Sequence, residues 1–448
     1  MTKLVFMKSK IALMCVLSIA GISTAYAQDT LRIEEAIQKG LEKNFAIQVA
    51  RNQAEIARNN NTLGNAGFLP VVTADGTINK RVEDSETQYS TASIPDRNDK
   101  GAETTNYNYG IDATWTVFDG LTMFATQDRL SLEENIGNEQ ARLQIENLLA
   151  ELINGYYQIV AQQKANRVLE NAVEVSQERI RIAETKRDLG SGSDYDLLQA
   201  RADFNEDRAA LIRSGTILKQ AKILVNQILS DSSFTDFDVE STIEMRDLMD
   251  LESLLNTSYD ENTSLMIARL NERVANEEIK ELRGDWFPQI AVNGGYGYNR
   301  TESSSGFADF SKTTGFNYGV TARINLFDGF NKSRKTQNAQ LRLKNQQLQL
   351  EELKLSVSSE LQQTYQQYED ALTLIELEEE NLQYTKQTQE IALERFRLGT
   401  ISSVELRETQ LSLLNAENRL ILAQIEAKTA ETELLRLSGN LLRKDEKL

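Results

Sequence analysis

Carboxylates are the main residues available for chemistry in this sequence of 448 residues. It contains 67 aspartates and glutamates but no histidine, and its single cysteine, Cys15, lies in a predicted export signal. Ser-His and Cys-His nucleophiles and nearly all zinc sites are therefore excluded. A hydrolase with two carboxylates needs a compact cleft, whereas these acids are spread along predicted helix faces, where charge is usually solubilising. We expect no enzyme, no catalytic residue, no metal and no cofactor.

The N-terminus has the pattern of a signal peptide over residues 1–27. Three lysines precede an apolar run from Ile11 to Gly21, and Ala25-Tyr26-Ala27 offers a small-x-small cleavage site. Cys15 follows a methionine rather than a small residue, which argues against a lipoprotein. The mature chain is expected to begin near Gln28.

Charge and hydropathy limit the partners and the membrane contacts expected of the mature chain. Its formal charge is −18, and loss of the three signal lysines makes it about −21, so no nucleic acid partner is expected. Beyond the signal, no apolar stretch reaches the roughly 20 residues of a membrane helix. Any insertion into a membrane must use β-strands, because backbone groups in lipid have to be paired.

The sequence repeats itself once. NYNYGIDATWTVFDG at 106–120 matches FNYGVTARINLFDG at 316–329, a spacing of 209 residues. RDLGSGSDYDLLQAR from Arg187 matches FRLGTISSVELRETQ from Phe396 at the same spacing. The internal repeat predicts two halves with one order of elements: helix, strand, polar loop, strand, long helix, tight turn, helix.

Upstream of the strands the spacing is 218 residues, with Asn44 matching Asn262, which fits a longer polar loop in the first copy. The predicted junctions between helices and strands are Pro70 and Pro288 on one side, and Asp119-Gly120 and Asp328-Gly329 on the other. The predicted organisation is as follows: a first repeat over 28–230 with a hairpin at 67–120 and a turn at 189–193, an equatorial spacer over 231–260, a second repeat over 261–438 with a hairpin at 286–329 and a turn at 398–402, and a tail over 439–448.

Alternation with a period of two residues predicts four strands, two in each repeat. The second and fourth strands place apolar side chains on one face and polar ones, including Asp112 and Arg323, on the other. A soluble sandwich has such strands too, but two hairpins are too little sheet for one. Strands of about 10 to 12 residues suit a tilted membrane crossing, and their aromatic residues fit the girdles of an outer-membrane barrel.

The predicted sheet is incomplete, because four strands cannot close a barrel. An open edge in lipid leaves backbone groups unpaired at several kcal/mol each, so several chains must share one barrel. A dimer would give eight strands with a filled interior, whereas a trimer would give twelve strands and a lumen. The polar faces favour a wet interior, so we expect a homotrimer with Asp112 and Arg323 as lumen candidates.

A long helix is predicted after each FDG sequence. Apolar residues at helical spacing continue for about 100 Å, at 1.5 Å per residue. The helices stop at Leu189-Gly190 and Leu398-Gly399, where glycine suits a left-handed C-cap. Return helices with heptads in matching register follow each turn and indicate partner helices.

Shorter helices complete the predicted tube. Each return helix covers only half of its long neighbour, and a helix before each hairpin is expected to cover the other half. These helices are predicted over Thr30–Gly64 and Glu261–Gly284. Each repeat then contributes one long helix and two shorter ones placed end to end.

This order of elements resembles the TolC-like outer-membrane efflux and secretion factors. The resemblance covers nearly the whole mature chain and rests on LRIEEAIQKGLEKN after the signal, the two proline junctions, the doubled FDG and the doubled Leu-Gly turn. It implies a mixed α/β membrane protein, in which a trimeric 12-stranded β-barrel is continued by a long α-helical coiled-coil barrel. It also implies a passive exit duct of a tripartite efflux or type I secretion system in the outer membrane of a Gram-negative bacterium, extending into the periplasm.

Partners follow from the same resemblance. A periplasmic adaptor protein would dock at the turns, at Leu189, Gly190, Leu398 and Gly399, and connect the duct to an inner-membrane transporter of the RND or ABC class. Lipid of the outer membrane would surround the barrel. The exported compound and the pump class are not written in the sequence.

The second turn carries candidate gate residues. GTISSVELRE from Gly399 aligns with the family segment whose two acids, three residues apart, ring the tunnel entrance, and these are Glu405 and Glu408 here. Threefold symmetry would place six carboxylates at one constriction, which favours cations. Ser402-Ser403-Val404-Glu405 is also a capping box, in which Glu405 would close the helix N-terminus instead. Both interpretations stay open for Glu405.

The latch of the family is altered in this sequence. A tyrosine and an arginine close the tunnel in the best-known member, and the aligned residues here are Phe396 and Ile401. Asp196 matches their acidic partner and is a third gate candidate. Arg395 or Arg397 would have to replace the missing contacts.

A second class of function fits much of this pattern. An exported coiled-coil adhesin or surface filament would also be acidic and helical. It need not repeat a strand-loop-strand unit before each long helix, so we expect the channel.

Overall fold

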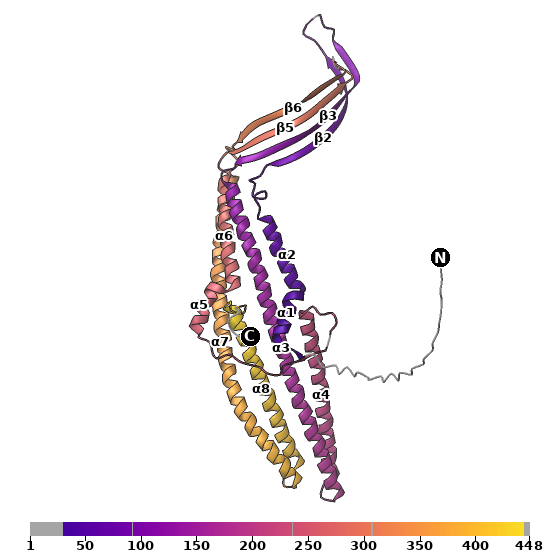
Figure 1. Ribbon diagram of the computed structural model, residues 1–448, viewed down its shortest axis with the longest axis vertical. Helices are drawn as coiled ribbons and strands as arrows, with labels where there is room; N and C mark the ends of the chain where they lie inside the picture. Colours follow the sequence, from indigo (N-terminus) through magenta and orange to yellow (C-terminus); the bar gives the residue numbers. More distant parts are fainter. Residues whose placement is uncertain (1–29, 92, 235, 306–307, 443–448) are drawn as a thin grey trace, which may run out of the picture.

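The molecule is elongated, with a sheet at one end and long helices over the rest of its length (Figure 1). The computed structural model describes residues 30–91, 93–234, 236–305 and 308–442. The predicted signal peptide, residues 1–27, lies outside these ranges, as does the end of the predicted tail. Two helices of 67 residues each, α3 (Thr122–Asp188) and α7 (Asn331–Arg397), run from the sheet to the opposite end.

Four antiparallel strands form the large sheet, in the order β2-β3-β5-β6. They are β2 (Val71–Thr87), β3 (Arg97–Phe118), β5 (Gln289–Ser303) and β6 (Phe310–Arg323). The central pair, β3 and β5, joins the two repeats, with Tyr109 opposite Tyr298. The strands are longer than the 10 to 12 residues expected, chiefly because β2 and β3 continue to pair after β5 has ended at Ser303.

The two faces of the sheet differ as the alternation predicts. On one face, Tyr109 stacks on Tyr298 with ring centroids 4.9 Å apart, and Tyr296 lies 4.6 Å from Phe316. On the other face, polar side chains join the strands, as where Asn293 Nδ2 donates to Thr321 Oγ1 at 2.9 Å. One face is therefore apolar and aromatic, and the other is polar.

Each FDG sequence forms the junction between a strand and a long helix. Asp119 Oδ2 accepts a hydrogen bond from the Met123 N–H at 2.9 Å, and Asp328 Oδ2 accepts one from the Lys332 N–H at 2.8 Å. These carboxylates satisfy free N–H groups in the first turn of each helix. Gly120 has a φ of 74°, and a side chain there would overlap the backbone of Gly284.

The remaining helices also occur in matching pairs. In the first repeat they are α1 (Ile33–Lys43), α2 (Phe45–Asn60) and α4 (Asp194–Ile228), and in the second they are α5 (Leu251–Glu261), α6 (Thr263–Gly284) and α8 (Ser403–Leu437). Pro70 and Pro288 directly precede β2 and β5. Helix α5 lies mostly in the segment expected to be a spacer, yet it repeats α1 at the spacing of 218 residues. The second repeat therefore begins near Leu251.

The single helix expected over Thr30–Gly64 is wrong, because asparagine breaks it into α1 and α2. Asn44 Oδ1 accepts hydrogen bonds from the N–H groups of Ala46 and Ile47, and its amide donates to the Ile228 carbonyl at 2.8 Å. Asn262 repeats the arrangement, capping Leu265 at 3.0 Å and donating to Leu437 at 2.9 Å. A side chain that caps a helix start and also binds another helix end makes the break favourable.

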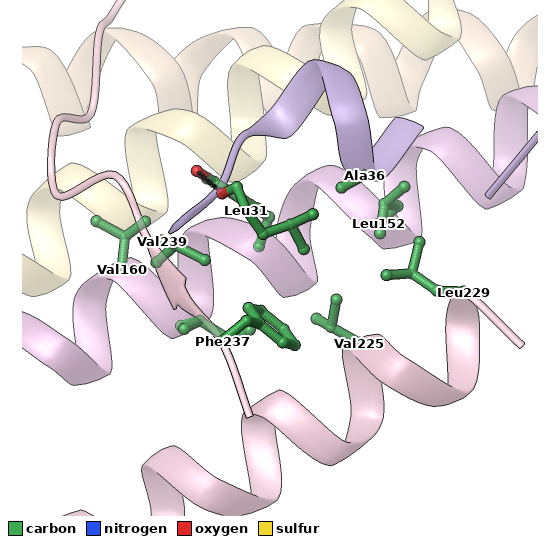
Figure 2. Packing of buried hydrophobic residues seen from close by; sticks show 10 residues of the cluster. Leu31, Ala36, Leu152, Val160, Val225, Leu229, Phe237 and Val239 are labelled. Atoms are coloured by element: carbon green, nitrogen blue, oxygen red, sulfur yellow. Dashed lines mark hydrogen bonds between the residues drawn. The ribbon is translucent and has the colours of Figure 1, made fainter. Parts of the chain in front are cut away.

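The main core lies midway along the long helices, where α1, α3 and α4 of the first repeat meet. Figure 2 shows this core in the first repeat, with Val225 of α4 beside Phe237 and Leu152 of α3 near Ala36 and Leu229. A short strand β1 (Thr30–Leu31) pairs in parallel with β4 (Asp238–Val239) beside it. The second repeat has the equivalent core, with Leu361 and Leu434 at the positions of Leu152 and Val225.

Candidate functional site

The polar face of the sheet holds both lumen candidates but does not pair them. Asp112 lies beside Asn317, and the two side chains cover the Cα of Gly295, where a methyl group would collide with both. Arg323 is exposed at the end of β6, opposite Gln289. Within the described ranges neither Asp112 nor Arg323 forms an ion pair. The face is a set of exposed hydrogen-bonding groups, which suits contact with water.

The two Leu-Gly turns lie at the end of the molecule far from the sheet and have the same backbone geometry. Gly190 and Gly399 have φ values of 74° and 78°. Left-handed backbone at this position lets the turn N–H groups reach the last helix carbonyls, as where Thr400 N donates to Arg395 O at 3.0 Å. Leu189 and Leu398 are equally exposed, each with 77% of its surface accessible. An apolar side chain thus projects from each turn.

Of the gate candidates, Glu405 and Asp196 occupy the same position, three residues after the serine N-cap of a helix. Glu405 Oε2 accepts from the Ser402 N–H at 2.8 Å while Ser402 Oγ accepts from the Glu405 N–H, so the capping-box alternative is the one present. In the first repeat the Asp196 N–H donates to Ser193 Oγ, but the Asp196 carboxylate accepts from the Ser193 hydroxyl and not from a backbone N–H, so the box is incomplete. Glu408 is exposed and has no ion-pair partner among the described residues.

Two contacts join the tips of the hairpins where the family latch would lie. The Lys186 ammonium lies 4.1 Å from the centroid of the Phe396 ring and donates to the Phe396 carbonyl at 2.5 Å. Arg397 reaches across to Glu178 of α3 at 3.2 Å, whereas Arg395 forms no ion pair in the part of the chain described. Hydrogen bonds from Arg181 and then Arg397 lower the pKa of Glu178 to about 2.

A buried charged cluster, which was not among the predicted sites, lies deeper between the hairpins. Arg179 of α3 is fully buried and donates to Asp203 of α4 at 3.0 Å and to Ser403 Oγ of α8 at 3.0 Å. Arg407 of α8 holds Asp207 of α4 through two hydrogen bonds of 2.8 and 2.9 Å. Burial lowers the pKa of the Arg179 guanidinium.

A sequence signal for this cluster did exist. Asp203 and Asp207 are four residues apart and so share one helix face. They flank Phe204 in the heptad pattern, where apolar residues are the rule. Neither residue type nor spacing indicates the partner helix, because Arg179 and Arg407 lie in different repeats.

The comparison with protein families follows the repeat found in the sequence. The family model described as outer membrane efflux protein matches residues 36–230 and again 254–440. The chain belongs to the outer membrane efflux protein family. Both matches span a complete set of helix, hairpin and helical return, so family membership extends over nearly all of the described chain.

Relatives of this efflux protein are distant in sequence. Protein CyaE of Bordetella pertussis is 22% identical over 337 residues, which cover 74% of this chain and 70% of that protein. The toluene efflux pump outer membrane protein TtgC of Pseudomonas putida is 21% identical, with coverage of 91% and 82%.

Solved structures share the fold. The CmeC outer membrane channel of Campylobacter jejuni superposes with a TM-score of 0.76 at 14% identity, covering 93% of this chain and 87% of that one. VceC of Vibrio cholerae gives a TM-score of 0.74 at 14% identity, with coverage of 91% and 96%.

Membership of this family establishes the class of function. The efflux protein is an outer-membrane channel for efflux or secretion, of the TolC family, which is a family of channels and not of enzymes. The predictions of family, fold, channel function and outer-membrane location are confirmed. Among the described residues no helix has both the length and the apolar character needed to span a membrane.

Proposed function

We propose that three copies of this chain form one closed channel that conducts substrates passively from the periplasm to the exterior. The proposal rests on one observation: surfaces that are covered in one repeat of the chain are exposed at the equivalent positions of the other repeat.

The sheet supplies the first argument. Within the described chain, β2 and β6 each have one neighbouring strand, so two edges of a membrane sheet lack partners. Pairing β6 of one copy with β2 of the next satisfies both edges, and closed barrels are the stable form of a sheet in lipid. Three copies give twelve strands, enough for a lumen lined by the polar face.

The long helices supply the second argument. Ile182 of α3 is 7% exposed and packs on Phe396 and Leu406, whereas its repeat counterpart, Ile391 of α7, is 60% exposed. Val168 of α3 is 9% exposed, against 58% for its counterpart Leu377. Equivalent apolar residues are thus covered in α3 and uncovered in α7, although each helix lies in a hairpin of the same length.

Helix faces that could cover α7 are exposed elsewhere on the same chain. In α8, Ile421 packs on Val168 of α3, and its counterpart in α4, Ile212, is exposed. Helix α2 likewise exposes Val49 and Ile56 on one face. We therefore place α2 and α4 of one copy against α7 of the next. Such a head-to-tail contact uses two different surfaces and closes as a ring.

The passage and its partners follow from this assembly. The exposed Glu408 is proposed for the acidic ring at the entrance, whereas Glu405 completes the capping box of α8 and Asp196 binds the serine that caps α4. The projecting Leu189 and Leu398 offer an apolar docking surface for a periplasmic adaptor. An inner-membrane transporter of the RND or ABC class would supply the energy, since relatives are named as parts of efflux pumps.

Purified mature protein tests the proposal. In detergent we expect a particle of three chains, and in planar bilayers a small, cation-preferring conductance. Glu408→Lys should reduce the preference for cations, whereas Glu352→Lys, exposed on α7 far from the turns, should not. A water-soluble monomer, or trimers that conduct no ions, would reject the channel. Unchanged selectivity in Glu408→Lys would remove that residue from the ring.

A further inference from the structure

The apolar face of the sheet carries basic residues toward its end far from the helices. The strands β2, β5 and β6 can be followed in that direction in Figure 1. On the apolar face of each of these strands, the first charged side chain is basic, and the three residues are Lys80, Arg300 and Lys312. Lys80 and Lys312 are exposed and Arg300 is half-buried. These three residues are here termed the basic rim.

Aromatic side chains precede the basic rim on the same face of the sheet. They are Tyr107, Tyr109, Tyr296, Tyr298, Phe316 and Tyr318. The Lys312 ammonium lies 5.2 Å from the centroid of the Tyr298 ring, so the rim and the aromatic group are in contact. Aromatic residues form a girdle where the strands of a membrane barrel leave the apolar layer. In such a barrel the basic rim lies at the level of the lipid headgroups, in the leaflet that faces away from the helices.

The basic rim keeps a positive charge although the chain as a whole is acidic, with a formal charge of −18. Lys80 pairs with Glu103 at 2.8 Å, and Arg300 pairs with Glu302 at 2.6 Å. Lys312 forms no ion pair with any residue in the part of the chain described. Ion pairs as exposed as these two contribute little, so a more highly charged anion can compete for both cations.

The internal repeat shows that the sheet does not need these basic residues in order to fold. At the spacing of 218 residues, Lys80 corresponds to Tyr298 and Arg300 corresponds to Val82. At the spacing of 209 residues, Lys312 corresponds to Glu103. Equivalent strands therefore pair in the same way with an aromatic, an aliphatic or an acidic side chain at these positions. The basic residues call for a cause outside the folding of one chain.

We propose that the basic rim binds the phosphate groups of an anionic lipid in the outer leaflet, with the acyl chains of that lipid lying on the aromatic group. A lipid with several acyl chains and more than one headgroup phosphate, such as the lipid A part of a lipopolysaccharide, has this chemistry. The guanidinium of Arg300 suits a phosphate through paired hydrogen bonds, and the two lysines add point charges. The inference rests on the proposed barrel, which turns the apolar face toward lipid.

Binding of diphosphorylated lipid A to the mature protein in detergent, counted by native mass spectrometry, tests the basic rim. Combining Lys80→Gln, Arg300→Gln and Lys312→Gln should lower the affinity about tenfold or more. The control combines Arg81→Gln, Arg97→Gln and Lys100→Gln, which remove the same charge. Arg81 lies on the polar face, and the other two lie in the part of the β2–β3 hairpin that projects beyond β5. The control should bind lipid A as the wild type does.

Further measurements decide between a lipid and free phosphate, and cover the case in which the triple variant does not fold. Excess inorganic phosphate should leave lipid A bound, and its release would overturn the lipid as the occupant. Lys312→Gln alone should lower the affinity several-fold.

Unchanged affinity in the triple variant, or in Lys312→Gln when the triple variant does not fold, would overturn the basic rim. An equal loss in the control would do the same. If wild-type trimers conduct ions but bind lipid A no better than the variants do, only this inference fails. Absence of trimers or of conductance would instead overturn the proposed channel, so the two failures are distinguishable.

Discussion

The two repeats of this chain fold alike but have different surroundings. Helix α3 is covered by helices of both repeats, whereas α7 is covered on one side and carries exposed apolar residues on the other. The same pattern of residues is thus core in one place and surface in the other. An exposed apolar stripe on a soluble part of a protein usually marks an interface, and the covered repeat shows what that interface should look like.

The largest expected effect separates assembly from folding. Ile391→Asp should leave the chain folded but unable to form trimers, because the charge would be buried only between copies. Ile182→Asp places the charge inside one copy and should destabilise the chain itself by several kcal/mol. Size measurement in detergent and limited proteolysis distinguish the two results.

Glu390→Gln, an exposed change beside the same stripe, is the control and should do neither. Intact trimers in Ile391→Asp would contradict the proposed contact between α7 and the next copy.

A smaller effect, similar in the two repeats, is expected when the asparagine caps are removed. Asn44→Ala and Asn262→Ala should each lower the free energy of unfolding by about 2 to 4 kcal/mol, because a cap is lost and a buried carbonyl loses its donor. Thermal unfolding of the purified protein measures both. Asn60→Ala, at the exposed end of α2, is the control and should change the free energy of unfolding little. A large difference between the effects of Asn44→Ala and Asn262→Ala would contradict the equivalence of the two caps.

The smallest effect concerns pH at the tip. The pKa of Glu178 is lowered to about 2, so its ionised form is favoured by folding. Its contribution is present above the ordinary glutamate pKa and is lost as pH falls through about 2. The difference in thermal stability between wild type and Glu178→Gln should be constant from pH 7 to 5 and shrink below about 4.5. A difference that grows on acidification would contradict the assigned partners.

Several elements could be read from the sequence because their causes are local. The strands follow from alternation, and the turns at Gly190 and Gly399 follow from the need for left-handed backbone. The break at Asn44 could also have been predicted, since the repeat pairs it with Asn262. It was missed because the helical periodicity continues across it, and the binding of its amide to Ile228 is a tertiary contact.

The sequence by itself determined the repeat, the strand faces, the long helices and the family, since each depends on residue type and spacing along the chain. Only the tertiary structure decided which of two equivalent helices is covered, and that Arg179 and Arg407 meet Asp203 and Asp207. The physical reason is that burial and ion pairing depend on which helices become neighbours. Asp207 and Arg407, which lie 200 positions apart, carry no local mark of that choice.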